Sequence, residues 1–433
     1  MPRDWSPAGL LHWRWPTARS LLPVFVGGAI VVGALLRFGW LSDMEYKGDE
    51  RWSFDRSQRV GSAEPWPALG MPSSVGLCNP GLSVWVFVVL ARIFGAHHPV
   101  ALDRAVVACD VSAFVLLFAF VVRGMPSHEG EPWLWGLALA AVNPIAVLLE
   151  RKIWAQSVLP IFCAAFLIGW LRRDRWWGAL SWGVVGALLG QIHMGGFFFA
   201  AGFVVWELCA GRFRTDRRKS TRWVPWLAGT TLGVVPFVPW LGYALRAHHR
   251  AAMFAWSEIE SLRFYRLWLS DTFGLGLDYS LGGQYLDFLR YPIFGSGDTY
   301  PALYLQGLSF SVGVYVAASA GGRLWACRGR WRQAPSVLRT ASEAAFTGGA
   351  ALVGYGLLLT ATGLYVWRHY LIVTFPLEWT TLACVALASV RRPRRWLAAL
   401  WTAQLALSLT FLGYIHEHHG AVQGDYGRAF QWQ

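Results

Sequence analysis

The sequence predicts an all-α, polytopic transmembrane helical bundle, and two features of its composition carry this prediction. Hydrophobic residues make up 55% of the 433 residues and charged residues only 15%, whereas an ordinary soluble domain has about 25% charged residues. So few polar side chains cannot coat a water-soluble globule of this size. The 27 Trp and 14 Tyr are typical of side chains that lie at the headgroup level of a bilayer.

The positions of the basic residues along the chain are explained by membrane insertion. A formal charge of +13 would suggest nucleic acid in a soluble protein, but the basic clusters lie in short segments between apolar runs, as the positive-inside bias requires. We therefore predict no nucleic-acid partner. The six Cys contain no CxxC pair, so neither a disulfide framework nor a zinc site is indicated.

Eleven apolar runs approach the length of about 20 residues that a spanning helix needs. They cover residues 21–41, 101–122, 133–149, 155–171, 177–192, 195–210, 223–245, 303–320, 344–363, 371–390 and 396–414. The first run contains Arg37 and precedes no small-residue cleavage site, so we expect an uncleaved first helix instead of a signal peptide.

One further apolar run, from Leu82 to Phe94, is short and contains Arg92, so it either spans the membrane or lies flat along the interface. If it lies flat, all the basic clusters fall on the same side as the basic N-terminus. These clusters are Arg3, Arg14 and Arg19, then 172–175, 212–222, 323–339 and 391–395. We therefore predict about 11 spans in a single domain over residues 1–433, with the N-terminus in the cytoplasm and the C-terminus outside.

This topology places two long loops on the external side, at 42–100 and 246–301. The second loop contains aromatic and basic stretches at 253–256 and 262–268, which we expect to form juxtamembrane helices in the interface. A flat helix over the 82–94 run is expected in the first loop.

Two acids lie deep within predicted spans, Asp110 in the second and Glu378 in the tenth. Each is either part of a proton or ion relay or a hydrogen-bond partner between helices. Because no chain of further ionisable residues crosses the bilayer with them, the pattern favours the structural role.

The first external loop opens with an acidic pair, Asp49 and Glu50, soon after the first span. A carboxylate at the membrane surface can act as a general base on an incoming hydroxyl. The alternative interpretation is a solvated start of the loop.

A charged segment follows the third span on the same side and contains Arg151, Lys152 and Gln156. These side chains are predicted to anchor an anionic group. The alternative is that the two cations extend to the lipid headgroups, as basic residues at helix ends often do.

Two more polar segments fall in the same external layer. His193 ends the fifth span, where it could instead be satisfied by a backbone carbonyl. Arg368, His369 and Tyr370 precede the tenth span, and a guanidinium there could hold a lipid phosphate by a forked pair of hydrogen bonds.

Together these motifs resemble the GT-C glycosyltransferases, in the family-39-like branch of bacterial protein O-mannosyltransferases and aminoarabinose transferases. The similarity covers most of the chain. It is carried by the Gly-Asp-Glu-Arg segment 48–51, the flat run 82–94, the Asn-Pro pair 143–144, the Arg-Lys-Ile-Trp-Ala-Gln-Ser segment 151–157, the turn 191–193 and the segment 368–370.

The resemblance implies a polyprenyl-phosphate-linked sugar as donor, with Asp49 as catalytic base, Glu50 as its partner and basic residues on the lipid phosphate. The sequence departs from the family at the second acidic site, because Glu150 directly precedes Arg151 and lies out of register. No cofactor is therefore certain, and a divalent metal is possible.

We predict a glycosyltransferase of the plasma (inner) membrane that moves the sugar to a hydroxyl of a lipid, glycan or protein acceptor on the periplasmic or extracellular face. The alternative is a lipid or solute transporter or flippase of the cell envelope, which would be expected to show inverted repeats and broken helices at mid-membrane. A membrane scaffold would not need the acidic pair. The sequence gives neither the sugar nor the acceptor.

Overall fold

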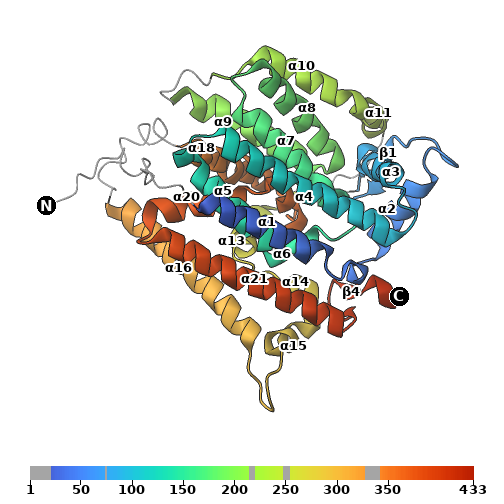
Figure 1. The fold of residues 1–433 in the computed structure, drawn as a ribbon. Helices are drawn as coiled ribbons and strands as arrows, with labels where there is room; N and C mark the ends of the chain where they lie inside the picture. The colour runs from blue at the N-terminus through green and yellow to red at the C-terminus, as the bar shows by residue number, and fades with distance from the viewer. Residues whose placement is uncertain (1–20, 74–75, 214–219, 247–253, 327–341) are drawn as a thin grey trace.

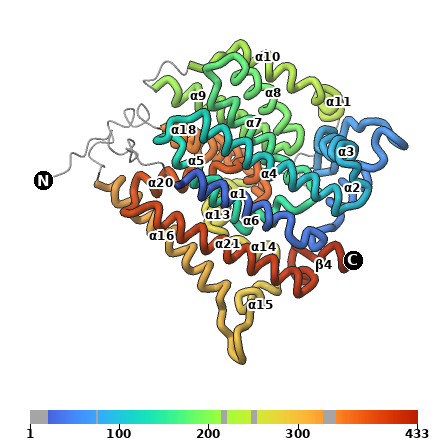
Figure 2. Tube along the Cα trace, in the orientation of Figure 1, coloured from blue at the N-terminus to red at the C-terminus, as the bar shows by residue number. Residues whose placement is uncertain are grey.

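The computed structural model describes residues 21–73, 76–213, 220–246, 254–326 and 342–433 (Figure 1). It is 76% helical with almost no sheet, so the all-α prediction is confirmed. Arg3, Arg14, Arg19, Cys327, Met253 and parts of the basic clusters at 212–222 and 323–339 lie outside the described residues. The long helices α1 (Leu22–Phe38), α4 (Pro99–Gly124), α16 (Pro301–Ala326) and α21 (Pro393–Glu417) run roughly alongside one another (Figure 2). Short helices such as α3 (Leu82–Phe94) and α15 (Tyr285–Arg290) lie across them.

Within the described residues, six helices are long and apolar enough to cross a bilayer, or seven if one bent pair counts as a span. A multi-pass membrane protein follows, whereas the count of about 11 spans stays a prediction. The six are α4 (Pro99–Gly124), α9 with a 3-10 extension (Gly195–Phe213), α10 with α11 (Trp223–Val234 and Val238–Arg246), α16 (Pro301–Ala326), α18 with α19 (Glu343–Gly349 and Gly356–Ala361) and α21 (Pro393–Glu417).

The other predicted runs are helical too, but shorter. They form α1 (Leu22–Phe38), α5 (Ser127–Val142), α7 (Leu159–Leu171), α8 (Trp176–Ile192) and α20 (Leu377–Ser389).

Two predicted continuous runs are broken in the structure. The run at 133–149 divides at Asn143, whose Oδ1 accepts the N–H groups of Ile145 and Ala146 at 3.0 Å and begins α6 (Pro144–Leu149). The run at 371–390 divides before Pro376, and its halves, Arg368–Thr374 and α20, meet at a bend of 70°. Proline lacks the amide hydrogen that would continue the helix.

The first loop leaves the bundle and returns to it at the same end. It contains α2 (Gly48–Arg59), β1 (Leu69–Pro72), β2 (Cys78–Pro80) and α3 (Leu82–Phe94). Figure 1 shows α2, α3 and the C-terminus gathered at that end. The helix α3 therefore does not carry the chain to the opposite end. That it lies flat in the membrane interface stays a prediction.

The opposite end of the bundle holds the described basic segments. Arg173 is buried and pairs with Glu343 at 2.8 Å and Glu207 at 3.2 Å, and Arg172 donates to the carbonyl of Gly124 at the end of α4. Arg394 binds Glu131 at 2.7 Å. Basic side chains thus close the end that the sequence predicts to be cytoplasmic.

The second loop is helical, as predicted, and one of its helices packs into the bundle, while its place in the membrane interface stays a prediction. It forms α12 (Trp256–Glu260), α13 (Arg263–Thr272), α14 (Asp278–Leu281) and α15 (Tyr285–Arg290). The helix α13 buries Phe264 and Trp268 in the bundle, and the Phe264 ring lies 5.3 Å from Tyr355. Its apolar face is therefore covered by protein.

The C-terminal tail packs back onto the first loop. After α21 it forms a short hairpin of β3 (Gly420–Ala421) and β4 (Gly427–Arg428). His416 contacts Asp43 at 2.7 Å, and the amide of Phe430 donates to the carbonyl of Met44 at 3.1 Å. The hairpin also contacts the second loop, because the amide of Tyr426 donates to Ser280 O at 2.9 Å.

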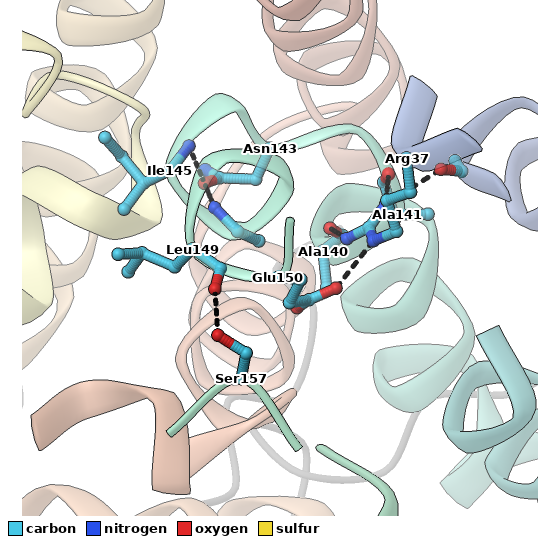
Figure 3. A network of polar contacts seen from close by, with 10 residues as sticks. Arg37, Ala140, Ala141, Asn143, Ile145, Leu149, Glu150 and Ser157 are labelled. Carbon is cyan, nitrogen blue, oxygen red and sulfur yellow. Dashed lines mark hydrogen bonds and ion pairs between the residues drawn. The ribbon is translucent and has the colours of Figure 1, made fainter. Parts of the chain in front are cut away.

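A buried ion pair joins α1 to the end of α6 (Figure 3). Arg37 has no exposed surface, and its Nε lies 2.6 Å from Glu150 Oε2. The guanidinium also donates to the carbonyl of Ala141 at 2.6 Å. Beyond Glu150, Ser157 donates to Leu149 O at 2.7 Å and folds the following segment back against α6.

We expect Arg37→Met to destabilise the protein by about 3–5 kcal/mol, because it leaves the Glu150 carboxylate buried without its cation. The double variant Arg37→Met/Glu150→Gln should lose less, since no buried charge then stays unpaired. Thermal unfolding in detergent measures both, with Arg104→Met on the exposed face of α4 as control. Equal losses for the single and double variants would contradict this role.

Candidate functional site

A cavity of about 370 Å³ opens at the end of the bundle where the first loop and the C-terminal tail meet. Its walls come from segments that are far apart in the sequence. The lining residues are Glu45, Lys47, Gly48, Asp49, Glu50, Met71, Pro72, Ser73, Asn79, Lys152, Trp154, Gln156, His193, Met194, Tyr279, Trp367, His369, Tyr370 and Asp425.

The acidic pair lies on the first turn of α2. The Lys47 amide donates to Glu50 Oε2 at 2.9 Å, and this bond caps the helix. Carboxylates on a first turn are also stabilised by the positive end of the helix dipole. Both acids line the cavity, but Asp49 is exposed and Glu50 is buried. Adjacent acids therefore have different environments.

Burial gives Glu50 an unusual protonation equilibrium. Loss of solvation and, to a smaller extent, the neighbouring Glu45 raise the pKa of its carboxyl to about 7, while Lys152 acts in the opposite direction. Near neutral pH, the Glu50 carboxyl therefore exchanges a proton within the wall of the cavity.

Glu45 lies between two lysines. It is only 2% exposed, pairs with Lys47 Nζ at 2.6 Å and also pairs with Lys152 Nζ. Lys47 reaches further to Asp425 Oδ1 at 3.3 Å. This chain of charges ties together the first loop, the segment after α6 and the C-terminal hairpin.

Aromatic rings form another side of the cavity, which we call the aromatic wall: Trp154, His193, His369 and Tyr370. The His369 ring centre lies 4.6 Å from Trp154, 5.5 Å from His193 and 4.9 Å from Tyr370. Lys152 Nζ lies 5.4 Å from the Trp154 ring. Lys152 therefore stands where the charged residues meet the aromatic wall.

Besides Glu45 Oε2, which pairs with Lys152, two cavity residues contain buried polar atoms without hydrogen bonds. Gln156 Oε1 and His193 Nδ1 have no partner within the described ranges, and both side chains are 6% exposed. Gln156 lies on a 3-10 turn (Ala155–Val158) and His193 in the turn between α8 and α9. A buried polar atom without a hydrogen-bond partner destabilises the folded protein. A ligand that hydrogen-bonds to these atoms removes that cost and gains affinity from it.

Seven of the nine residues predicted from the sequence line this cavity: Asp49, Glu50, Lys152, Gln156, His193, His369 and Tyr370. The other two are held elsewhere. Arg151 donates to the carbonyls of Gly39 at 2.9 Å and Trp40 at 2.7 Å, at the end of α1.

Arg368 turns away from the cavity to an ion pair with Asp271. With Arg368 and Arg151 both absent from the lining, the hypothesis that they hold a substrate phosphate is not supported by their positions.

Among the residues of the site that sequence reasoning did not single out are Trp154 of the aromatic wall and four polar residues, Glu45, Lys47, Tyr279 and Asp425. Glu45 and Lys47 belong to the same charged segment as Asp49, so their charge was a usable signal. Asp425 and Tyr279 carry no such signal, because only the packing of the hairpin against the second loop brings them to the cavity.

Across the described ranges, no group of three or more His, Cys, Asp or Glu side chains is arranged to hold a metal ion. The possible divalent metal stays a prediction.

No protein-family model, curated protein or solved structure gives a significant match to this chain. The similarity to GT-C glycosyltransferases therefore stays an expectation from sequence motifs, and the function must be argued from the cavity.

Glu50→Gln tests the environment of the buried acid. The raised pKa means that the folded protein binds this proton more tightly than the unfolded chain does, so wild-type stability falls as the pH rises from about 4.5 to about 7. The wild type loses about 3 kcal/mol at most in its free energy of unfolding over this range. We expect Glu50→Gln not to show this loss, because the amide does not titrate. Unfolding temperatures at pH 4.5 to 8 measure it.

The control is Glu260→Gln, at an exposed site on α12, which should follow the wild type. If the unfolding temperatures of the wild type and Glu50→Gln changed with pH in the same way, the raised pKa of Glu50 would be contradicted.

Proposed function

We propose that the protein is a glycosyltransferase that moves a sugar from a polyprenyl-phosphate donor to an acceptor hydroxyl at the external face of the plasma (inner) membrane. The observation that supports this most is the cavity itself, in which an exposed and a buried acid, two lysines and the aromatic wall converge from distant segments. A lipid-linked donor enters from the bilayer, so no separate nucleotide-binding domain is needed.

Asp49 is the proposed general base. It is the exposed acid of the pair, and it has no hydrogen bond or ion pair to any residue that the structure describes. It accepts the proton of the acceptor hydroxyl while the hydroxyl oxygen forms a bond to the anomeric carbon. Glu50 is a positioning residue, because its bond to the Lys47 amide fixes the first turn that carries Asp49.

The leaving group is the polyprenyl phosphate, which takes the electron pair of the broken carbon–oxygen bond. Lys152 and Lys47 are the cations on the cavity wall among the described residues, and they stabilise this growing negative charge. These two lysines replace Arg151 and Arg368 as the proposed phosphate ligands. A single displacement of this kind inverts the configuration at the anomeric carbon.

Asp49→Asn keeps the side-chain shape but cannot accept a proton. We expect transfer to fall by about 10²- to 10⁴-fold, while binding of undecaprenyl phosphate is retained. Purified protein in nanodiscs is assayed with a panel of undecaprenyl-phosphate-linked hexoses and pentoses. The acceptor is chosen from envelope lipids and glycans that change in a strain lacking the protein.

The matched control is Asp55→Asn, an exposed acid on the same helix that does not line the cavity, and it should keep wild-type transfer. An active Asp49→Asn enzyme would exclude the proposed base.

The proposal also requires the cavity end of the bundle to face outwards. Reporters fused near His98 and after Gln433 should report a position outside the cytoplasm. A reporter fused at Arg392 should report the cytoplasm, because the basic end of the bundle is retained there. A cytoplasmic signal from either of the first two would reverse the orientation and place the cavity on the wrong face.

The second candidate function is a lipid or solute transporter. Two acids of α4, Asp103 and Asp110, have no exposed surface, and their carboxylate oxygens have no hydrogen bond within the described ranges. Buried acids in a spanning helix are typical of ion-coupled transport. Substrate accumulation in proteoliposomes that Asp110→Asn abolishes, without any transfer product, would favour this function over glycosyl transfer.

A further inference from the structure

The cavity has two chemically distinct sides, and Lys152 lies at their boundary. On one side it pairs with Glu45, and on the other its Nζ lies 5.4 Å from the Trp154 ring. If Lys152 holds the donor phosphate, the group covalently attached to that phosphate lies against one of these two sides. The charged side already has its own partners, since Glu45, Lys47 and Asp425 bind one another.

We propose that the aromatic wall and Gln156 form the subsite for the donor's sugar, and that this sugar is neutral and rich in hydroxyl groups. The subsite rests on the proposed function, which supplies the phosphate beside Lys152. It adds the chemistry of the transferred group and the residues that select it.

The unpaired polar atoms identify the ligand as one with hydroxyl groups. Gln156 Oε1 accepts hydrogen bonds, the other end of the same amide donates them, and His193 does either according to its tautomer. A sugar hydroxyl both donates and accepts, so it can satisfy each of these atoms. Phosphate oxygens at neutral pH chiefly accept, and a hydrocarbon chain does neither.

The aromatic wall favours a ring with a polarised C–H face. Each aromatic ring has a negative face, which attracts the slightly positive C–H groups of a pyranose. Trp154 and His369 pack edge to face with an angle of 67°, so each ring helps to hold the other in place. A lipid tail on this wall would leave the polar ends of His193, Gln156 and Tyr370 facing hydrocarbon.

The charges oppose an anionic sugar. His193 lies outside both α8 and α9, and burial lowers its pKa to about 4, so the ring is neutral at pH 7. Among the described lining residues, the acids Glu45, Asp49, Glu50 and Asp425 outnumber the two lysines. A uronic acid would add a second negative charge beside the donor phosphate, in a cavity where acids already outnumber lysines.

The experiment compares two probes on the full-length protein in nanodiscs. One is bare undecaprenyl phosphate, and the other is undecaprenyl phosphate carrying glucose, mannose, N-acetylglucosamine or glucuronic acid. We expect at least one neutral sugar to tighten binding, and glucuronic acid not to do so. Gln156→Leu and Trp154→Leu should each weaken binding of the sugar-linked lipid by roughly 2- to 10-fold. Both should leave the affinity for bare undecaprenyl phosphate unchanged.

Two further variants separate the subsites. Lys152→Gln should weaken both probes together, because it removes the phosphate ligand. Gln423→Leu, at an exposed hairpin residue that does not line the cavity, should change neither. Size-exclusion profiles establish that each variant is folded.

Each unfavourable result has a distinct meaning. Equal binding of bare and sugar-linked lipid by the wild type, a preference for glucuronic acid, or an equal loss on both probes in Gln156→Leu and Trp154→Leu would overturn the sugar subsite while leaving the proposed transferase intact. Failure of the wild type to bind any polyprenyl phosphate would overturn both proposals.

Discussion

The site depends on the buried ion pair between Arg37 and Glu150. Leaving one charge of a buried pair without its partner is strongly destabilising, and the Arg37–Glu150 pair joins α1 to the chain where α6 ends. The three charged residues that begin there have separate positions: Glu150 stays in the core, Arg151 binds the carbonyls at the end of α1, and Lys152 enters the cavity. Trp154 and Gln156 follow in the same short segment, so one interhelical ion pair sets the position of a whole side of the cavity.

The sequence predicted the helices well because an apolar run and a helix in a bilayer have the same physical cause. It did not predict the breaks at Asn143 and Pro376, where side-chain capping and a missing amide hydrogen override hydropathy. Seven of the predicted residues line one cavity, since polar side chains gather at one end of the bundle. The sequence did not predict the places of Arg151 and Arg368, because a long guanidinium reaches partners that only tertiary packing reveals.

The neighbouring acids Asp49 and Glu50 show how one helix turn can separate two roles. Glu50 is turned into the protein, where loss of solvation and the nearby Glu45 favour its neutral form. Asp49 stays exposed on the cavity side and keeps access to an incoming hydroxyl. A general base needs contact with its substrate, whereas a buried capping group contributes by holding the turn. The two environments thus support the proposed roles, with Asp49 as the base and Glu50 as the positioning residue, although both side chains are carboxylic acids.

The hairpin after α21 contributes to the cavity, so residues from both ends of the chain are needed to form it. Asp425 reaches Lys47 across nearly the whole chain, and the Phe430 amide pairs with the Met44 carbonyl beside it. Lys47 in turn shares Glu45 with Lys152, so the tail, the first loop and the segment after α6 hold one another through a single buried carboxylate. Contacts so distant in sequence close long loops, and the entropy cost of closing them must be offset by packing elsewhere. The charged side of the cavity therefore needs the tail packed against the first loop, because Asp425 follows α21 and pairs with Lys47 only in that arrangement.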